Sequence, residues 1–161
     1  MTPAMPDAPQ TLADRLAVQD VLSAYARAVD GKDWAALESV FTADLEADFR
    51  AFAGRETVKG RDRWIAAIRQ TIAGLDATQH LLGNHCVTLD GDRATMNAYV
   101  QAVHRLKTDR GDGEYTVGGH YDVELRREAD GWRIRFYRLN ILWERGNRDI
   151  MRQAARRAGT G

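Results

Sequence analysis

The feature that most constrains the fold is a change of hydrophobic period near the middle of the chain. Up to residue 74, apolar residues recur at the three- and four-residue spacing of amphipathic helices. From Thr78 onward they alternate with polar residues, as in strands that are buried on one face. A block of helices followed by an antiparallel meander predicts an α+β fold. We expect N-terminal helices packed on a strongly curved antiparallel sheet, which leaves a cone-shaped pocket suited to a small molecule.

The first half of the chain predicts helices over residues 11–30, 34–41 and 61–73. Thr11 can cap the first helix, Gly31 can end it, and Asp33 can cap the second. Residues 45–52, with a less regular pattern, are the candidate first strand, and 54–60 the loop that follows it.

The second half predicts strands joined by turns at residues 90–92, 109–113 and 130–131. In the last strand the apolar parity changes after Phe136, which predicts a bulge near Tyr137 and Arg138. A basic segment with no clear apolar face follows. We therefore divide the chain into an unfolded lead-in over 1–10, which holds all three prolines, a single domain over 11–145, and a basic C-terminal tail over 146–161.

Composition narrows the class of partner. Lys and Arg together number 23, as do Asp and Glu, and this balance gives no electrostatic reason to bind nucleic acid or an anionic membrane. Cys86 is the single cysteine, which suits a reducing cytoplasm. No apolar run approaches the roughly 20 residues of a membrane helix, and the N-terminus lacks the regions of a signal peptide. We expect a cytoplasmic protein with a small-molecule substrate.

The four histidines are sorted by strand parity. His104 shares its face with apolar residues and should point inward, whereas His120 lies on the more polar parity. His80 and His85 should face opposite ways, which argues against a shared metal site. A pocket-facing pair of His80 and His104 follows, although each can instead be a half-buried strand histidine bonded to a neighbour. With no phosphate loop or nucleotide fingerprint either, we expect no metal and no cofactor.

Asp30 and Tyr25 are the candidate partners of that pair. An aspartate at the end of the first predicted helix is badly placed against the helix dipole, which favours a specific partner over its alternative role as a turn residue. Tyr25 lies five residues earlier, roughly 140° round the helix, so it either flanks a cavity with Asp30 or belongs to the core. A carboxylate that orients an imidazole makes a general base that needs no cofactor.

Several segments, in order over residues 12–143, carry a resemblance to a known family. They are Val-Asp-Gly-Lys-Asp-Trp at 29–34, Asp-Phe-Arg-Ala-Phe at 48–52, Thr-Gln-His at 78–80, Val-His-Arg at 103–105 and Asp-Gly-Trp at 130–132. With them the chain resembles the SnoaL-like branch of the nuclear-transport-factor-two-like superfamily. Within that branch it is similar to scytalone dehydratase and, more loosely, to bile-acid dehydratase and hexachlorocyclohexane dehydrochlorinase.

This resemblance implies a cone-shaped α+β barrel and a homo-oligomer, a trimer before a dimer. It also implies an Asp–His dyad without cofactor at Asp30 and His80, a second pocket histidine at His104, and a pocket tyrosine at Tyr25. Two tyrosines that polarise the substrate carbonyl in scytalone dehydratase are replaced here by Val29 and Phe49. The resemblance therefore implies that the base is retained and that this carbonyl-binding apparatus is not.

Together these features predict a cofactor-independent lyase of secondary metabolism, acting by dehydratase-type elimination on a small cyclic, fairly hydrophobic substrate. His80 would remove a proton from carbon, Asp30 would stabilise the imidazolium, and Tyr25 or His104 would donate a proton or hydrogen bond. The alternatives are a polyketide cyclase, a ketosteroid-type isomerase or a non-catalytic binding module. The expected substrate-binding residues are Trp34, Phe49, Phe52, Trp64, Met96, Asp122, Phe136, Arg138 and Asn140.

Overall fold

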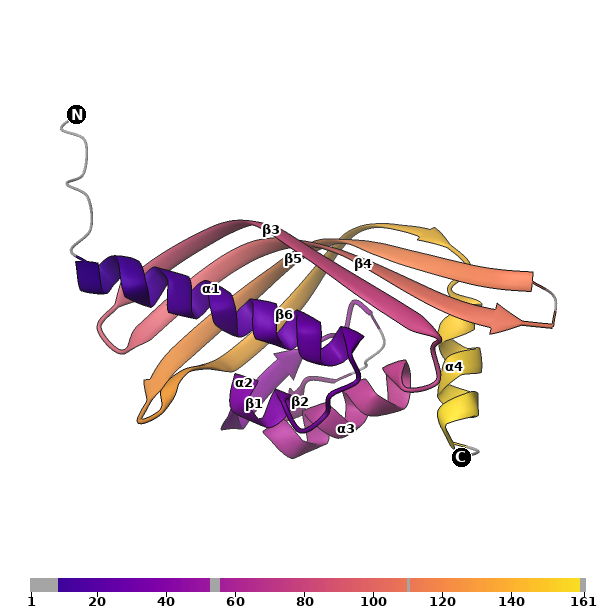
Figure 1. Cartoon of the computed structure of the whole chain (residues 1–161), viewed down its shortest axis with the longest axis horizontal. Coiled ribbons are helices and arrows are strands. Elements are labelled where there is room, and N and C mark those ends of the chain that lie inside the picture. Colours follow the sequence, from indigo (N-terminus) through magenta and orange to yellow (C-terminus); the bar gives the residue numbers. More distant parts are fainter. Residues whose placement is uncertain (1–8, 53–55, 110, 160–161) are drawn as a thin grey trace.

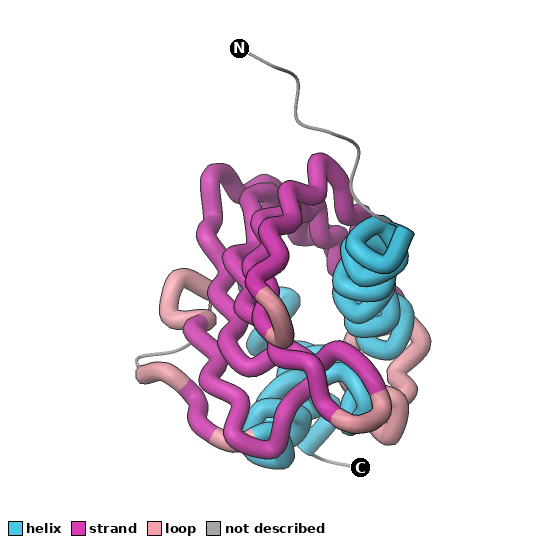
Figure 2. Tube along the Cα trace, turned by 90° about the vertical axis from the view of Figure 1, so that its left-hand side faces the viewer, coloured by secondary structure: helices cyan, strands magenta, loops and turns pink. Residues whose placement is uncertain are grey.

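A computed structural model describes residues 9–52, 56–109 and 111–159. Its long first helix, α1 (Pro9–Asp30), runs beneath a broad sheet, and the shorter helices α2 (Leu37–Val40) and α3 (Arg61–Ile72) lie beside it on the same side (Figure 1). Seen from the end, the strands curl round the helices (Figure 2). The predicted α+β class, with helices packed on a curved sheet, is confirmed.

The sheet is built mainly from four long strands in sequence order. These are β3 (Ala77–Asp90), β4 (Arg93–Thr108), β5 (Gly111–Glu128) and β6 (Gly131–Gly146). Each pairs antiparallel with the next, as the alternation predicts. Two earlier strands, β1 (Phe41–Asp48) and β2 (Val58–Lys59), complete the order β2-β1-β6-β5-β4-β3 in the described part of the chain. Because β1 runs parallel to β6, the sheet is mixed rather than purely antiparallel, and it does not close into a barrel.

The hydrophobic core fills the space between the concave face of the sheet and the helices. Alternate residues of β4 and β5 point into it, so that Ala98, Val100 and Val123 are almost fully buried. From α1 come Val18 and Leu22, which are both fully buried. Among the described helices, none combines the length and the apolar character that a membrane span requires.

Helix and strand ends differ from the sequence prediction mainly around α2. The predicted helix over 34–41 is reduced to one turn, and β1 begins at Phe41, four residues before the predicted start of the strand. The register between β1 and β6 is irregular, and this explains why the apolar residues of β1 do not alternate regularly in the sequence. At the N-terminus, α1 already begins at Pro9, inside the predicted lead-in, of which residues 1–8 lie outside the described part.

A bulge in β3 corrects the predicted orientation of His85. The register with β4 shifts between Gly83 and Cys86, where Asn84 adopts a left-handed conformation with φ of 49°. The extra residue inverts the alternation, so that His85 becomes half-buried on the same side as His80. The prediction that these two histidines face opposite ways was therefore wrong.

The predicted bulge in β6 exists but is displaced. The register with β5 shifts at Arg135, two residues before the predicted position, and again at Leu142. The insertion at Arg135 explains the change of apolar parity along this strand, from Trp132 and Ile134 to Tyr137 and Leu139.

The C-terminal segment, predicted to lack an apolar face, forms the helix α4 (Asp149–Gly159), which packs on α3. Ile150, Met151 and Ala154 make a short buried face that basic residues conceal in the sequence. At Gly74, a β-carbon would lie 1.9 Å from the carbonyl oxygen of Ala154, so α4 approaches this glycine more closely than any other residue would allow.

Candidate active site

Asp30, the last residue of α1, faces the beginning of β3 and binds three groups there. His80 Nδ1 lies 2.7 Å from Asp30 Oδ1, and the backbone N–H of His80 donates to Oδ2 over 2.8 Å. The Thr78 hydroxyl donates to Oδ1 over 2.8 Å. Since a carboxylate can only accept, Nδ1–H donates to Asp30, and His80 keeps the lone pair of Nε2 free for chemistry. The sequence reasoning brought Asp30 and His80 together but missed Thr78.

A lysine clamp brings the two elements into place. Lys32, in the turn after α1, has a left-handed backbone with φ of 55°. Its ammonium group donates to the carbonyl oxygens of Ala73 and Leu75, over 3.2 and 2.6 Å. These two carbonyls lie between α3 and β3. The clamp therefore ties the end of α1 to the segment that leads into His80.

Asp30 is held as a carboxylate. Burial acts to raise its pKa, but the His80 ring, the His80 backbone N–H and the Thr78 hydroxyl together keep that pKa below its usual value. The Asp30 side chain is 24% exposed, whereas that of His80 is only 6% exposed. The dyad thus lies at the edge of the interior, with its imidazole on the inner side.

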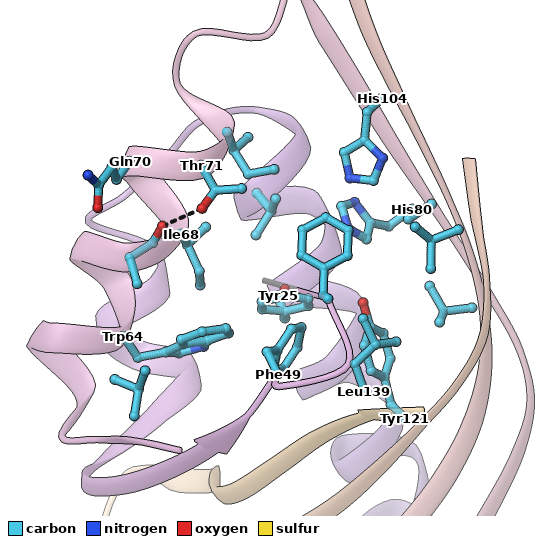
Figure 3. Close-up of a pocket in the computed structure, with 18 of the residues that line it drawn as sticks. Tyr25, Phe49, Trp64, Ile68, Gln70, Thr71, His80, His104, Tyr121 and Leu139 are labelled. Carbon is cyan, nitrogen blue, oxygen red and sulfur yellow. Dashed lines mark hydrogen bonds between the residues drawn. The ribbon is translucent and has the colours of Figure 1, made fainter. Parts of the chain in front are cut away.

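His80 opens into a cavity of about 300 Å³ between α3 and the sheet (Figure 3). Its walls are mainly aromatic and aliphatic, and among the described lining residues there is no Lys or Arg. The lining comprises Tyr25, Val29, Phe49, Phe52, Glu56, Val58, Trp64, Ala67, Ile68, Gln70, Thr71, Ile72, His80, Val100, Ala102, His104, Val117, Tyr121 and Leu139.

His104 also lines the cavity, but it has the character of an acceptor. Its ring lies 6.1 Å from that of His80, nearly perpendicular to it. Nδ1 donates to the carbonyl oxygen of Tyr115 over 3.1 Å, because a carbonyl can only accept. Burial, followed by repulsion from charge on His80, lowers the pKa of His104 to about 4. His104 is therefore neutral at pH 7, and its Nε2 can accept a hydrogen bond but not donate one.

Tyr25 reaches the cavity from α1. Its ring centroid lies 6.2 Å from that of His80 and its side chain is almost fully buried. Burial raises the pKa of Tyr25 to about 12, so it stays a protonated donor at neutral pH. Tyr25 thus lines the cavity, and Asp30, the last residue of the same helix, meets it only through His80.

The expected substrate-binding residues divide into two groups. Phe49, Phe52 and Trp64 lie in the cavity wall, and the Phe49 and Trp64 rings are 4.5 Å apart. Six others do not line it: Trp34, Met96, Asp122, Phe136, Arg138 and Asn140. Met96 belongs to the core, and Trp34 packs half-buried near α2.

The polar members of the second group bind other polar side chains away from the cavity. Asp122 accepts hydrogen bonds from the amides of Asn97 and Asn140, over 2.8 and 2.7 Å. Arg138 binds Asp48 over 3.0 Å, and its guanidinium lies over the Phe136 ring. Strand parity turns Asp122 outward, and the shift at Arg135 places Phe136 out of step with the inward residues.

The sequence analysis missed several lining residues, among them Tyr121, Leu139 and Ile68. Tyr121 has the same parity as the inward-facing Val117 and Val123, so the alternation could have found it. Within the described ranges, no three His, Cys, Asp or Glu side chains gather as a metal site. The single cysteine, Cys86, is exposed.

The fold, a curved sheet wrapped over helices with a pocket between them, is that of the nuclear-transport-factor-two-like superfamily. The SnoaL-like domain family matches residues 10–138, and the chain belongs to this family, as its resemblance predicted. The uncharacterized protein Rv2910c from Mycobacterium tuberculosis is 32% identical over 127 residues, covering 76% of this chain and 82% of the relative.

Solved structures agree with this assignment. The Kfla4162 protein from Kribbella flavida is 31% identical, with a TM-score of 0.81 over 91% of this chain and 99% of its own. The hexachlorocyclohexane dehydrochlorinase LinA-type3 from Novosphingobium barchaimii is 19% identical, with a TM-score of 0.72 over 85% of this chain and 92% of its own. At that identity the second likeness shows a shared fold.

Proposed function

We propose that this protein is a cofactor-independent lyase that eliminates water from a small, cyclic, fairly hydrophobic substrate, with Asp30 and His80 as its general base. The observation that carries the proposal is the 2.7 Å contact between His80 Nδ1 and Asp30 Oδ1 beside an apolar cavity. Burying a carboxylate and an imidazole beside apolar side chains costs desolvation free energy. Such pairs therefore occur preferentially at functional sites.

In the reaction, His80 Nε2 takes a proton from the carbon next to a carbonyl group of the substrate. Asp30 holds the Nδ1–H and stabilises the imidazolium that forms. The electron pair of the C–H bond moves onto the carbonyl oxygen as an enolate. When the enolate collapses, that pair forms a carbon–carbon double bond and the C–O bond of the leaving hydroxyl breaks. Tyr25 gives its proton to that hydroxide, which leaves as water, and the proton on His80 returns to Tyr25 through solvent.

The roles of Tyr25 and His104 follow from their protonation. Tyr25 carries its proton and lies next to His80, which suits it to be the acid. His104 is neutral and offers only the Nε2 lone pair, so we assign it the binding of a substrate hydroxyl as acceptor. This assignment chooses between the two donors that the sequence left open.

The cavity supports the substrate class. A volume of about 300 Å³ lies at the lower end of the usual range of roughly 300–1,000 Å³ for small-molecule pockets, which favours one ring or two fused rings. The described lining residues include Glu56 but no Lys or Arg, so an anionic substrate is disfavoured, and we take the substrate to be neutral. A relative named as a hexachlorocyclohexane dehydrochlorinase supports elimination from a ring as the type of reaction. We further propose a cytoplasmic homo-oligomer, a trimer before a dimer.

A suitable test uses 3-hydroxy-1-tetralone, a neutral two-ring ketone whose dehydration gives 1-naphthol. The wild type should form a product lighter by one water, and His80→Ala should slow it by about 10²–10⁴-fold, the usual worth of a general base. Asp30→Asn should also be slow. His120→Ala is the matched control, since His120 does not line the cavity.

Full turnover by His80→Ala would refute the mechanism. A product of unchanged mass that depends on His80 would instead identify a cyclase or a ketosteroid-type isomerase, which share the proton abstraction but have no leaving group. Saturable binding without any conversion would favour a binding module.

A further inference from the structure

Three buried tyrosines from three different elements pack together beside the dyad. They are Tyr25 of α1, Tyr121 of β5 and Tyr137 of β6, and none is more than 3% exposed. The ring centroid of Tyr137 lies 5.0 Å from that of Tyr25 and 4.7 Å from that of Tyr121. The Tyr25 and Tyr121 rings are 6.2 Å apart and nearly perpendicular. Tyr137 thus supports both of the other rings.

Two members of this cluster reach the cavity. Tyr25 and Tyr121 line it, whereas Tyr137 lies behind them, fully buried. Figure 3 shows Tyr25 and Tyr121 on one side of the cavity, below His80 and His104. The cavity therefore has donor phenols on one side and the acceptor nitrogen of His104 on the other.

Packing alone does not explain a phenol at position 121. Its neighbours include the Phe49 and Tyr25 rings, and a phenylalanine would fill the same space. A hydroxyl in such surroundings is unfavourable unless it finds a partner. The Tyr137 hydroxyl, further from the cavity, is buried and interacts with the Tyr25 and Tyr121 hydroxyls, without a hydrogen bond of normal geometry in the described part of the chain. The cluster as a whole therefore keeps hydroxyl groups that the apolar packing does not require.

We propose that Tyr121 is a further catalytic residue, which donates a hydrogen bond to the carbonyl oxygen of the substrate, and that Tyr137 is the positioning residue of the Tyr25 and Tyr121 rings. This inference rests on the proposed function. When His80 removes the proton, the electron pair moves to the carbonyl oxygen as an enolate, and Tyr121 stabilises that charge. When the enolate collapses, the C–O bond breaks and hydroxide takes the Tyr25 proton. One phenol therefore serves the carbonyl and the other the leaving group.

The carbonyl stretching frequency of bound 1-tetralone, labelled with ¹³C at the carbonyl carbon, measures this hydrogen bond directly. Binding to the wild type should lower the frequency relative to the ketone in an apolar solvent. Tyr121→Phe should lose at least half of that shift and bind the ketone several-fold more weakly. It should also slow 3-hydroxy-1-tetralone dehydration at least tenfold in kcat. Tyr99→Phe is the matched control, because Tyr99 is 53% exposed on β4 and does not line the cavity.

Two further variants separate hydrogen bonding from packing. Replacing Tyr121 by 3-fluorotyrosine keeps the ring and makes the phenol a stronger donor, so the carbonyl frequency should fall further than in the wild type. Tyr137→Phe, which keeps the ring, should retain the shift, whereas Tyr137→Leu should reduce it. A thermal melt of each variant identifies a loss that comes from unfolding.

The outcomes are distinct from those of the proposed function. Deuterium exchange of the protons next to the carbonyl of 1-tetralone reports the base, and His80→Ala should abolish it while leaving the carbonyl shift in place. An unchanged carbonyl frequency in both the Tyr121→Phe and the fluorotyrosine variants would overturn the role of Tyr121 and leave the dyad standing. Exchange that survives in His80→Ala would overturn the dyad instead. Failure of the wild type to bind 1-tetralone saturably would overturn this inference, which requires the cavity to accept a carbonyl group.

Discussion

We predict that protonation of His104 destabilises the folded protein in mild acid. Its pKa in the folded protein is about 4, compared with an ordinary value of roughly 6.5 in the unfolded chain. Between these values the unfolded chain binds the proton and the folded protein does not, so protonation favours unfolding. The contribution is fully present above pH 6.5 and is lost as the pH falls toward 4.

The size of the effect follows from the displacement of the pKa. One pKa unit corresponds to about 1.4 kcal/mol, so the difference between the two values represents at most about 3.5 kcal/mol. Because His104 is only 3% exposed, solvent screening reduces this little. The steepest slope should approach about 1.4 kcal/mol per pH unit. Asp30, whose pKa is held below its usual value, stays ionised over most of this window.

The assay is urea unfolding of the wild type and His104→Asn at pH 7.0, 6.0, 5.0 and 4.5, followed by tryptophan fluorescence. The asparagine amide can still donate to the Tyr115 carbonyl, but it does not titrate. The stability gap between the two proteins should therefore shift in favour of the variant as the pH falls. Parallel loss of stability in both proteins would refute the assignment of a neutral buried His104.

Three other substitutions test the supports of the site. Thr78→Val removes the hydroxyl from Asp30, which should raise the Asp30 pKa and cost about 1 kcal/mol of stability; a carboxyl ¹³C titration reads the pKa directly, and an unmoved value would exclude the contact. Lys32→Met breaks the clamp to two backbone carbonyls and should lower the free energy of unfolding in urea by about 1–3 kcal/mol. It should also change the His80 NMR signal, which a merely local role for the lysine would leave unchanged. Gly74→Ala forces a methyl group against the Ala154 carbonyl and should cost about 1–3 kcal/mol, whereas Gly83→Ala, with no atom within 4 Å, should not clash; equal stability of the two variants would contradict the close packing of α4.

The long periodic segments were predictable because a strand or helix buried on one face must repeat its apolar residues at a fixed spacing. β4 shows this clearly, with Ala94, Met96 and Ala98 buried and their neighbours more exposed. The β3 bulge was not predictable in the same way, since the left-handed turn at Asn84 leaves little trace in the pattern. The start of β1 was predicted wrongly for a related reason. The register of β1 with β6 is broken, so its burial does not alternate.

In the candidate site, too, some residues were predictable from the sequence and others were not. Asp30 was noticed because a carboxylate is poorly placed at a helix end, and the resemblance paired it with His80. Thr78 was not predicted, because a threonine two residues before a histidine indicates no function until α1 is known to place Asp30 beside it. The polar residues Asp122, Arg138 and Asn140 looked functional by type, yet their partners are other polar side chains rather than the cavity. Residue type predicts chemistry only once the facing element is known.

The structure also links the C-terminal helix to the base, although α4 contributes no lining residue in the described part of the chain. Ala154 of α4 packs against Gly74, and the two carbonyls that Lys32 binds belong to the residues on either side of that glycine. Lys32 in turn fixes the turn that follows Asp30. A displacement of α4 must therefore move the acceptors of the clamp before it reaches the dyad. Because hydrogen-bond geometry is steep in distance and angle, a small shift there is enough to loosen the contact on which the general base depends.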